Sequence, residues 1–276
     1  VIFEDELAAA EAAARELIAA DVDALIVQDM ALRQMNLPVE LHASTQAGGM
    51  TEEDAAFLEG CGFARIILER ALTLDDIRRI RRATHAVDLE CFVHGAICVG
   101  YSGRCFLSRS MSPRSGNRGE CSQACRLPYD LTDEARRTII AGKHLLSVRD
   151  MDLSPDLEAL MDAGVSSFKI EGRLKDLRYI KNVVSYYRDR LDEILSRRWK
   201  DYVRSSCGRT VREFEPDPSK SFTRGATEYM LHGKRRGVAS FDTPKAVGEY
   251  VGRVTGLVRG GFRMDCAVPL AAGDGI

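Results

Sequence analysis

Short apolar segments alternate with amphipathic segments along most of this chain, and this alternation limits the possible folds more than any other feature. The strand-like runs lie at 24–28, 39–42, 65–68, 89–93, 145–148 and 167–170. Most of them precede a stretch with apolar residues at helical spacing, as at 51–60, 73–84 and 175–197. Short buried strands that alternate with amphipathic helices are typical of parallel βαβ units. The sequence therefore predicts an α/β fold.

Six units of this kind are compatible with two α/β architectures. A TIM barrel is built from eight units, whereas an open doubly wound sheet can use six. The opening helix, expected at 4–20, has no strand before it. We therefore expect an incomplete TIM-like (β/α) barrel over residues 1–212 that lacks its N-terminal strands. The open sheet remains the alternative.

The character of the sequence changes after residue 212. Residues 213–225 contain Pro and Ser and have the composition of a linker, and residues 248–276 alternate apolar and polar residues with many glycines. Such alternation is the pattern of a small β-domain. We expect 213–276 to form a linker and the start of a small β-rich domain.

Four of the eight cysteines fall within the polar, turn-rich stretch 98–125: Cys98, Cys105, Cys121 and Cys125. A cysteine that fills a core sits singly on an apolar face, so four in a polar loop need another explanation. Zinc prefers two close cysteine pairs, disulfides need an oxidising compartment, and a 4Fe–4S cluster accepts looser spacing. The spacing C-x6-C-x15-C-x3-C favours the cluster, while zinc and a purely structural role remain open.

Composition bears on the choice among these explanations. The chain has 276 residues, 45% hydrophobic content and a net charge of −2, as an ordinary globular protein does. It contains no apolar run near the roughly 20 residues that a membrane span requires. The other four cysteines are scattered, which suits a reducing compartment better than a secreted protein. We expect a cytoplasmic protein without a membrane partner.

Charged residues cluster around the four cysteines. Arg104 and Arg118 belong to a group of arginines in or beside the loop, where Glu120 is the one acidic residue. Guanidinium groups there can offset the charge of a cluster or bind phosphate and carboxylate groups, unless the loop is simply a solvated basic surface. The strand expected at 89–93 places His94 and Cys98 just past its carboxyl end, where active sites of parallel α/β folds form.

The segments 90–98 (ECFVHGAIC) and 103–108 (GRCFLS) resemble the signature of the U32 peptidase family, E-x-F-x-x-G-[small]-[aliphatic]-C-x4-G-x-C-x-[aliphatic]-S. Every specified position of this long pattern is met. The resemblance continues at 42–46 (HASTQ), 117–121 (NRGEC), 169–173 (KIEGR) and 224–225 (RG). It therefore covers nearly the whole chain.

This resemblance implies an activity that differs from the family's name. The family is named for collagenase-like proteolysis, yet its well-understood members are similar to oxygen-independent hydroxylases that carry a 4Fe–4S cluster and depend on prephenate. The segment 222–254 looks most like the branch that hydroxylates a cytidine in ribosomal RNA. The resemblance thus implies a pyrimidine hydroxylase acting on ribosomal RNA or tRNA, with prephenate as co-substrate. It implies these cluster ligands: Cys98, Cys105, Cys121 and Cys125.

Further site residues follow other expected strands. Glu171 and Arg173 come just after the strand at 167–170, where Arg173 can bind an anion and Glu171 can orient it or act as a base. His94 is the candidate acid–base group near the cluster, and His42 and Gln46 are expected to line the same mouth. Each has a purely structural alternative, such as an ion pair closing the barrel end or a histidine held by hydrogen bonds.

Two other functions remain open. A peptidase lacks support from an HExxH helix or a GxSxG turn, although His94 and Cys98 form a nearby histidine–thiol pair. A non-catalytic metal-binding scaffold associated with RNA would keep the four cysteines alone. The pI of about 6.3 is unlike that of a dedicated nucleic-acid-binding protein, so the overall charge gives RNA binding only modest support. Local basic runs occur at 78–82, 136–137, 197–200 and 234–236.

Overall fold

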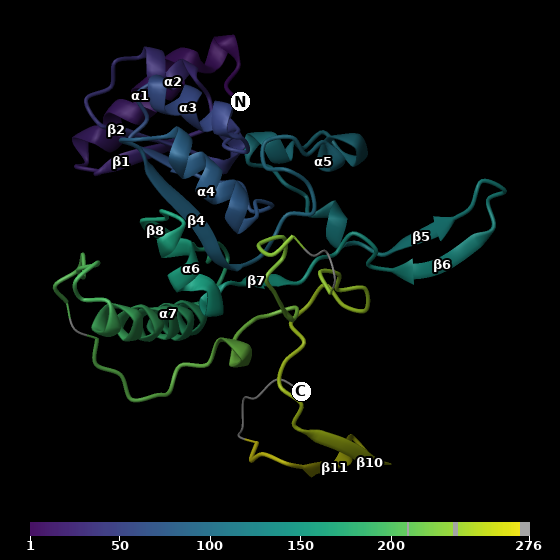
Figure 1. Cartoon of the computed structure of the whole chain (residues 1–276). Coiled ribbons are helices and arrows are strands. Elements are labelled where there is room, and N and C mark those ends of the chain that lie inside the picture. The colour runs from purple at the N-terminus through teal and green to yellow at the C-terminus, as the bar shows by residue number, and fades with distance from the viewer. Residues whose placement is uncertain (209, 234–236, 271–276) are drawn as a thin grey trace.

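The computed structural model describes residues 1–208, 210–233 and 237–270, and its centre is a seven-stranded mixed sheet (Figure 1). The strands of this sheet are β1 (Ala24–Val27), β2 (Glu40–Ala43), β3 (Arg65–Ile67), β4 (Asp88–Gly95), β7 (Asp150–Asp152), β8 (Ser167–Ile170) and β9 (Ala226–Thr227). The first four strands lie side by side in chain order and run parallel, and β8 is also parallel to β4. In contrast, β7 pairs antiparallel with the last residues of β4, and β9 pairs parallel with β7.

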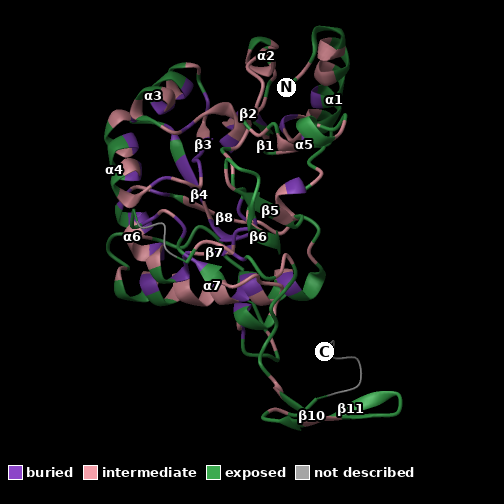
Figure 2. Ribbon diagram, turned by 90° about the vertical axis from the view of Figure 1, so that its right-hand side faces the viewer, coloured by how far each residue is buried: buried purple, intermediate pink, exposed green. Residues whose placement is uncertain are grey.

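Helices lie around this sheet on several sides (Figure 2). The helices are α1 (Leu7–Ala19), α2 (Ala31–Gln34), α3 (Glu52–Gly60), α4 (Leu74–Ala83), α5 (Leu107–Met111), α6 (Leu157–Asp162) and α7 (Leu177–Arg197). The helix α4 begins at a reciprocal cap, in which Thr73 Oγ1 accepts from the Asp76 N–H and the Asp76 carboxylate accepts from the Thr73 N–H. The Asp176 carboxylate caps α7 without such reciprocity, by accepting from the Tyr179 N–H over 2.8 Å.

The core forms between the helices and the alternate residues of β4. Leu89, Cys91 and Val93 are buried on one side of the strand, and they belong to one apolar cluster with residues of α4, α6 and α7. Side chains on a strand alternate between its two faces, so the residues between them point the other way. The helices therefore cover the face that carries these three residues.

The other face of β4 carries a polar cluster centred on Glu90. Its carboxylate pairs with Lys169 Nζ of β8 over 3.0 Å and with Arg65 Nη1 of β3 over 3.3 Å, and it accepts from Ser167 Oγ over 2.8 Å. Burial opposes ionisation of Glu90, but Ser167, Lys169 and Arg65 outweigh it and lower the pKa of this carboxyl group. The cluster joins β3, β4 and β8 through their side chains as well as through their backbones.

The predicted α/β class is confirmed, but the closure of a barrel is not. The described strands form an open sheet, in which β7 is antiparallel to its neighbour. The strand expected at 145–148 is wrong: a turn lies there, closed by the Ser147 N–H donating to the His144 carbonyl oxygen. The strand β7 instead follows at 150–152, because buried Asp150 pairs with Arg224 over 2.7 Å and draws that segment to β9.

Two antiparallel hairpins stand apart from the main sheet: β5 (Tyr129–Thr132) with β6 (Thr138–Lys143), and β10 (Gly252–Val258) with β11 (Gly261–Cys266). Both are largely exposed (Figure 2). After residue 212 the chain also returns to the main sheet through β9, and Ala239 forms an isolated bridge with Val148 outside that sheet. The division of the chain at residue 212 stays a prediction, and the basic run 234–236 lies outside the described residues. Among the described helices, none has the length and apolarity needed to cross a bilayer.

Candidate functional site

The carboxyl ends of β2, β3, β4 and β8 lie along the same edge of the sheet because these strands are parallel. The segments that follow them are in close contact: the Glu171 N–H donates to the His94 carbonyl oxygen over 2.9 Å. A Cβ atom on Gly95, whose φ is +101°, would lie 2.6 Å from the Glu171 carbonyl oxygen. Glycine at position 95 therefore lets β4 end directly against the residue that follows β8.

The loop that leaves β4 at this edge, residues 96–128 and hereafter the cysteine loop, folds back onto the segment after β2. A Cβ atom on Gly103, whose φ is +73°, would lie 2.5 Å from the Gln46 carbonyl oxygen. Within the loop, the buried Asn117 side chain accepts from the Cys105 N–H over 3.1 Å. The structure thus brings Gln46, predicted as a substrate-binding residue, against the cysteine loop.

The four cysteines predicted as ligands all belong to this loop. All eight cysteines of the chain are free thiols. The pKa of Cys125 responds to Cys121, Cys98 and Cys105, and the pKa of Cys98 responds to Cys121 and Cys105. The Gln123 N–H donates to Cys121 Sγ over 3.3 Å. Cys98 and Cys125 therefore each lie within electrostatic range of the other three thiols.

Burial raises the pKa of Cys98 and of Cys125, and the neighbouring thiols raise it further. Nearby guanidinium groups act in the opposite direction, Arg70 at Cys98 and Arg126 at Cys125. Although Cys98 reaches solvent, the surrounding protein atoms desolvate its sulfur. At neutral pH these thiols are protonated, so a metal group that binds them must release their protons.

The donor chemistry of the loop fits an iron–sulfur cluster, which takes four separate cysteine thiolates. The four thiols are unpaired and share one region, and Arg70 and Arg126 supply positive charge beside them. Arg126 is itself held firmly, because its guanidinium donates to the carbonyl oxygens of Val148 and Ile97 over 2.6 and 2.9 Å. Within the described part of the chain, no three His, Cys, Asp or Glu side chains are placed to hold a single metal ion.

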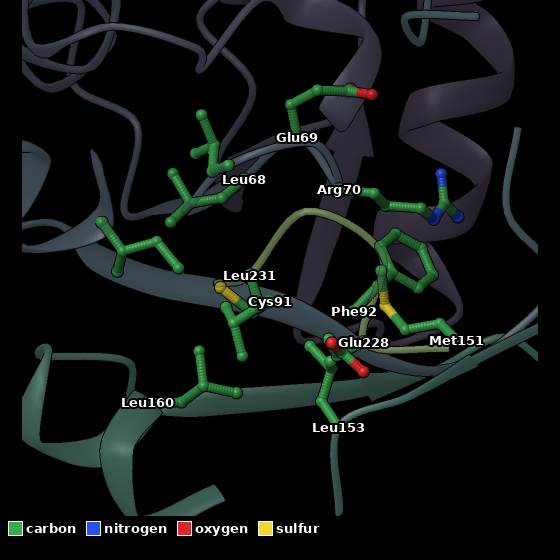
Figure 3. Close-up of a pocket in the computed structure, with 12 residues that line it drawn as sticks. Leu68, Glu69, Arg70, Cys91, Phe92, Met151, Leu153, Leu160, Glu228 and Leu231 are labelled. Atoms are coloured by element: carbon green, nitrogen blue, oxygen red, sulfur yellow. The ribbon is translucent and has the colours of Figure 1, made fainter. Parts of the chain in front are cut away.

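Arg70 and Glu171 form an ion pair next to the cysteine loop. Arg70 Nη2 lies 3.3 Å from Glu171 Oε2, and the guanidinium carbon lies 3.7 Å from the centre of the Phe92 ring (Figure 3). A second oxygen of Glu171 accepts from the Arg173 N–H over 3.2 Å. Arg70 follows β3 and contacts Phe92 of β4 and Glu171 after β8. Its positive charge also opposes the rise in the pKa of Cys98, so the same side chain interacts with three strand ends and with a thiol of the loop.

His94, the predicted acid–base residue, is buried at the end of β4. Its Nδ1 lies 3.2 Å from Tyr187 Oη and 4.0 Å from Asp152 Oδ1, and its ring packs against the Tyr179 and Tyr187 rings. Burial lowers the pKa of His94, although Asp152 and Asp150 oppose this effect. His94 is therefore a neutral imidazole at pH 7, held by α7 and by the strand end.

The predicted arginines occupy two different kinds of environment. Arg104 and Arg173 are exposed, and neither guanidinium has a partner among the described residues. Arg118 is committed elsewhere: it donates to Glu6 Oε1 over 2.7 Å and stacks on the Phe3 ring. The Arg118 hydrogen bond, with a contribution from the Phe3 N–H, lowers the pKa of Glu6 to about 2. Arg118 thus ties the cysteine loop to the N-terminal segment.

His42 lies within β2 and not beyond its end, because this strand begins and ends one residue later than expected. In the sheet it pairs with Ile26 and Arg65, and its Nε2 lies 3.5 Å from Glu40 Oε2. Among the described residues no hydrogen bond or ion pair joins His42 to the thiols, and its role in substrate binding stays a prediction.

Sequence reasoning missed Glu69 and Arg70, which directly follow the third strand-like run. Glu69 is 7% exposed and its Oε1 accepts from the Ser102 N–H and Oγ–H, each over 3.3 Å. Figure 3 shows both side chains at the edge of the core, with Glu69 directed away from Leu153 and Leu160. The signal that could have found them is their position, since charged residues just after a parallel strand lie at the functional edge.

Comparison with known proteins identifies related sequences along most of the chain. The model of peptidase family U32 matches residues 1–239. The whole chain is 47% identical, over 277 residues, to the 23S rRNA 5-hydroxycytidine C2501 synthase of Escherichia coli strain K12. It is 36% identical over 183 residues, 63% of the chain, to the tRNA hydroxylation protein P1 of Bacillus subtilis strain 168. It is 29% identical over 252 residues, 86% of the chain, to the collagenase of Porphyromonas gingivalis strain W83.

The chain spans only part of each of these relatives. The matched region covers 42% of the Escherichia coli protein, 43% of the Bacillus subtilis protein and 59% of the Porphyromonas gingivalis protein. Two of the three names describe RNA hydroxylation and one describes proteolysis.

Proposed function

Because this chain belongs to peptidase family U32, we propose that it forms the cluster-binding part of an enzyme that hydroxylates a cytidine in ribosomal RNA. The observation that supports this proposal is the presence of four free thiols in the one loop that leaves the carboxyl edge of the sheet, beside the Arg70–Glu171 pair. The 47% identity to the 5-hydroxycytidine synthase across the whole chain supports the choice of substrate.

In this proposal the thiols that hold a 4Fe–4S cluster are those of Cys98, Cys105, Cys121 and Cys125. When bound, the cluster supplies one-electron redox chemistry that amino-acid side chains lack. The residues around it maintain the charge balance: Arg70 and Arg126 lie close enough to influence the thiols, and Glu171 holds Arg70 in place.

Hydroxylation replaces a ring hydrogen of the base by a hydroxyl group, which is a two-electron oxidation. We assign both the oxygen atom and the acceptance of these electrons to prephenate as co-substrate: its C–OH bond breaks, the hydroxyl group joins the base, and the displaced proton and the two electrons form a C–H bond on prephenate. Prephenate carries two carboxylates, and guanidinium groups bind carboxylates through paired hydrogen bonds. The exposed, unpartnered side chains of Arg104 and Arg173 suit this task or the binding of RNA phosphates. His94 is buried away from solvent and orients the end of β4 through Tyr187 and Asp152.

A complementation experiment tests the proposal. An Escherichia coli strain without its 5-hydroxycytidine synthase receives this chain, either alone or in place of the matching segment of that enzyme. Ribosomal RNA nucleosides are then measured by mass spectrometry. We expect 5-hydroxycytidine to return with the wild-type sequence and to stay absent with Cys105→Ser, while the exposed control Cys207→Ser retains it. Hydroxycytidine that returns equally with Cys105→Ser contradicts the proposed role of the cluster, and its absence with both wild-type forms contradicts the proposed function.

A peptidase is the second candidate, and the collagenase among the relatives favours it. It would need a thiolate activated by a histidine. In the described structure His94 Nδ1 faces Tyr187 and Asp152, and no hydrogen bond joins it to Cys98. Gelatin cleavage by the purified chain that survives both iron removal and Cys121→Ser would support the peptidase over the hydroxylase.

The remaining predictions on partners and location belong to the same proposal. We propose an RNA partner, which follows from the substrate, and a cytoplasmic location, which the scattered cysteines of the sequence support.

A further inference from the structure

A cavity of about 430 Å³ lies directly beside the cysteine loop. Its size falls in the range of small-molecule sites, which measure about 300–1,000 Å³. Three segments line it: the residues after β3 and the first turn of α4, the start of the cysteine loop, and the residues after β9. The lining residues are Glu69, Ala71, Thr73, Asp76, Val99, Gly100, Tyr101, Tyr229, Met230 and Gly233.

The cavity and the thiols share a wall. Val99, Gly100 and Tyr101 directly follow Cys98, and a Cβ atom on Gly100 would lie 3.9 Å from Cys105 Cβ. A molecule in the cavity therefore lies next to the segment that joins two of the proposed cluster ligands.

Glu69 gives the cavity a buried acceptor. Only 7% of this residue is exposed, and both of its hydrogen bonds, from the Ser102 N–H and Oγ–H, use Oε1 at 3.3 Å. Within the described part of the chain, Oε2 accepts no hydrogen bond. The other acid, Asp76, is already committed, because its carboxylate accepts from the Thr73 N–H and pairs with Arg79.

Aromatic and apolar side chains provide the remaining walls. Tyr101 is 48% exposed, so its ring has a face available for stacking, and Ala71, Val99 and Met230 are apolar. Proteins that act on single bases of RNA bind them unstacked from the strand, on aromatic side chains, and read their edges by hydrogen bonds. A carboxylate accepts a hydrogen bond from the N4 amino group of cytosine.

We propose that this cavity binds the cytosine base of the substrate, with Tyr101 stacking on the ring and Glu69 accepting from the N4 amino group. This inference rests on the proposed function and adds to it the residue that selects the base. Uracil carries an oxygen acceptor in place of the amino group. This oxygen and the Glu69 carboxylate would both be acceptors, so no hydrogen bond could form between them. Glu69 thus favours cytosine over uracil.

Titration of the purified chain with cytidine and uridine 5′-monophosphates tests this inference, with calorimetry as the readout. We expect the wild-type chain to bind the cytidine nucleotide at least about fivefold more tightly, since one good base-edge contact discriminates by roughly that factor or more. In Glu69→Gln the amide can donate to the uracil oxygen, so the preference should disappear or reverse. Tyr101→Ala should weaken both nucleotides by about fivefold or more, because stacking does not distinguish between pyrimidines.

Asp75→Asn is the matched control, because it removes the same charge from an exposed residue of α4 that does not line the cavity. It should leave both affinities unchanged. Equal binding of the two nucleotides to the wild-type chain, or an unaltered preference in Glu69→Gln, overturns the inference. Because Tyr101 lies on an exposed loop, we expect Tyr101→Ala to fold. Its nucleotide affinities therefore still test the inference if Glu69→Gln fails to fold.

The two proposals fail separately. Selective cytidine binding without restoration of 5-hydroxycytidine in the complemented strain would retain the base site and reject the hydroxylase. Restored hydroxylation together with nucleotide affinities that ignore Glu69 and Tyr101 would retain the hydroxylase and reject this cavity as its base site.

Discussion

At the scale of single residues, Arg70 connects more of the site than any other side chain described above. It pairs with Glu171, stacks on Phe92 and acts electrostatically on Cys98. Its side chain is only 9% exposed, so these contacts are made with little screening by water. A planar guanidinium can stack and form directed hydrogen bonds at the same time, which an ammonium group cannot do.

Arg70→Lys should therefore be disruptive although it keeps the charge. We expect the free energy of unfolding to fall by about 1–2 kcal/mol, because the stacking on Phe92 and the directed bond to Glu171 are both lost. Urea denaturation of Arg70→Lys, Glu171→Gln and the double variant measures this. The two changes should be coupled by about 0.5 kcal/mol or more. Strictly additive effects would show that the pair contributes nothing as a pair.

His94 should give the stability of the protein a dependence on acid pH. Burial lowers its pKa in the folded state, whereas the unfolded chain binds a proton at His94 near its ordinary pKa of 6.5. The unfolded state therefore binds more protons as the pH falls below 6.5, and the folded state loses up to about 1.4 kcal/mol per pH unit through this residue. Above that pH the effect is absent.

The variant His94→Gln removes this titration. Between about pH 7 and about pH 5, its free energy of unfolding should decline less than that of the wild type. Denaturation curves at the two pH values provide the comparison. Identical declines in both proteins would mean that His94 accepts a proton in the folded state.

Residue chemistry was the part of the site that the sequence revealed most readily. Cys98, Cys105, Cys121 and Cys125 stand out because four thiols in a polar loop have few explanations. The role of Arg70 was not predicted because its partners come from β4 and β8, far away in sequence. Arg118 was predicted to bind substrate because of its position in the loop; its guanidinium pairs with Glu6, and its role in substrate binding stays a prediction.

At the scale of elements, β4 organises the site. It pairs with β3, β8 and β7, and its register shifts between Phe92 and His94. It ends at Gly95 in a left-handed conformation and continues into the cysteine loop. The direction in which this loop leaves the sheet therefore depends on the backbone at a single residue.

Gly95→Ala tests this dependence. The added Cβ meets the Glu171 carbonyl oxygen at 2.6 Å in a conformation that L-residues rarely adopt, so the free energy of unfolding should fall by about 2–4 kcal/mol. Gly142→Ala is the control, since φ there is +61° and nothing lies within 4 Å of the added atom. It should cost about 1 kcal/mol. If both variants lose the same free energy of unfolding, the close contact with Glu171 does not account for the effect of Gly95→Ala.

Most elements were predictable from the pattern of apolar residues, because buried strands and one-sided helices leave a local signature. The segment 145–148 misled because a short apolar run also suits a turn that is packed against the core. The actual strand β7 depends on the buried pair between Asp150 and Arg224, which are 74 positions apart. No local pattern reveals such a partner.

At the scale of the whole molecule, the open sheet gathers the ends of its parallel strands at one edge, and the cysteine loop is placed there by β4. The α/β class followed from the alternation of segments, whereas the openness of the sheet depends on strand order and on the antiparallel β7. The same edge carries the Arg70–Glu171 pair, and the cavity lined by Glu69 adjoins it. One surface therefore combines a candidate redox centre, positive charge and space for a base.

The central claim is that four thiols of one loop jointly bind a single iron–sulfur cluster, and the iron and sulfide content of the chain tests it most directly. After anaerobic reconstitution, the wild-type chain should contain about four iron and four sulfide per chain. That content should fall sharply in each of the variants Cys98→Ser, Cys105→Ser, Cys121→Ser and Cys125→Ser. Cys207→Ser and Cys266→Ser, at exposed positions outside the loop, should retain it. A wild-type chain without iron, or loop variants that keep the full content, would contradict the account.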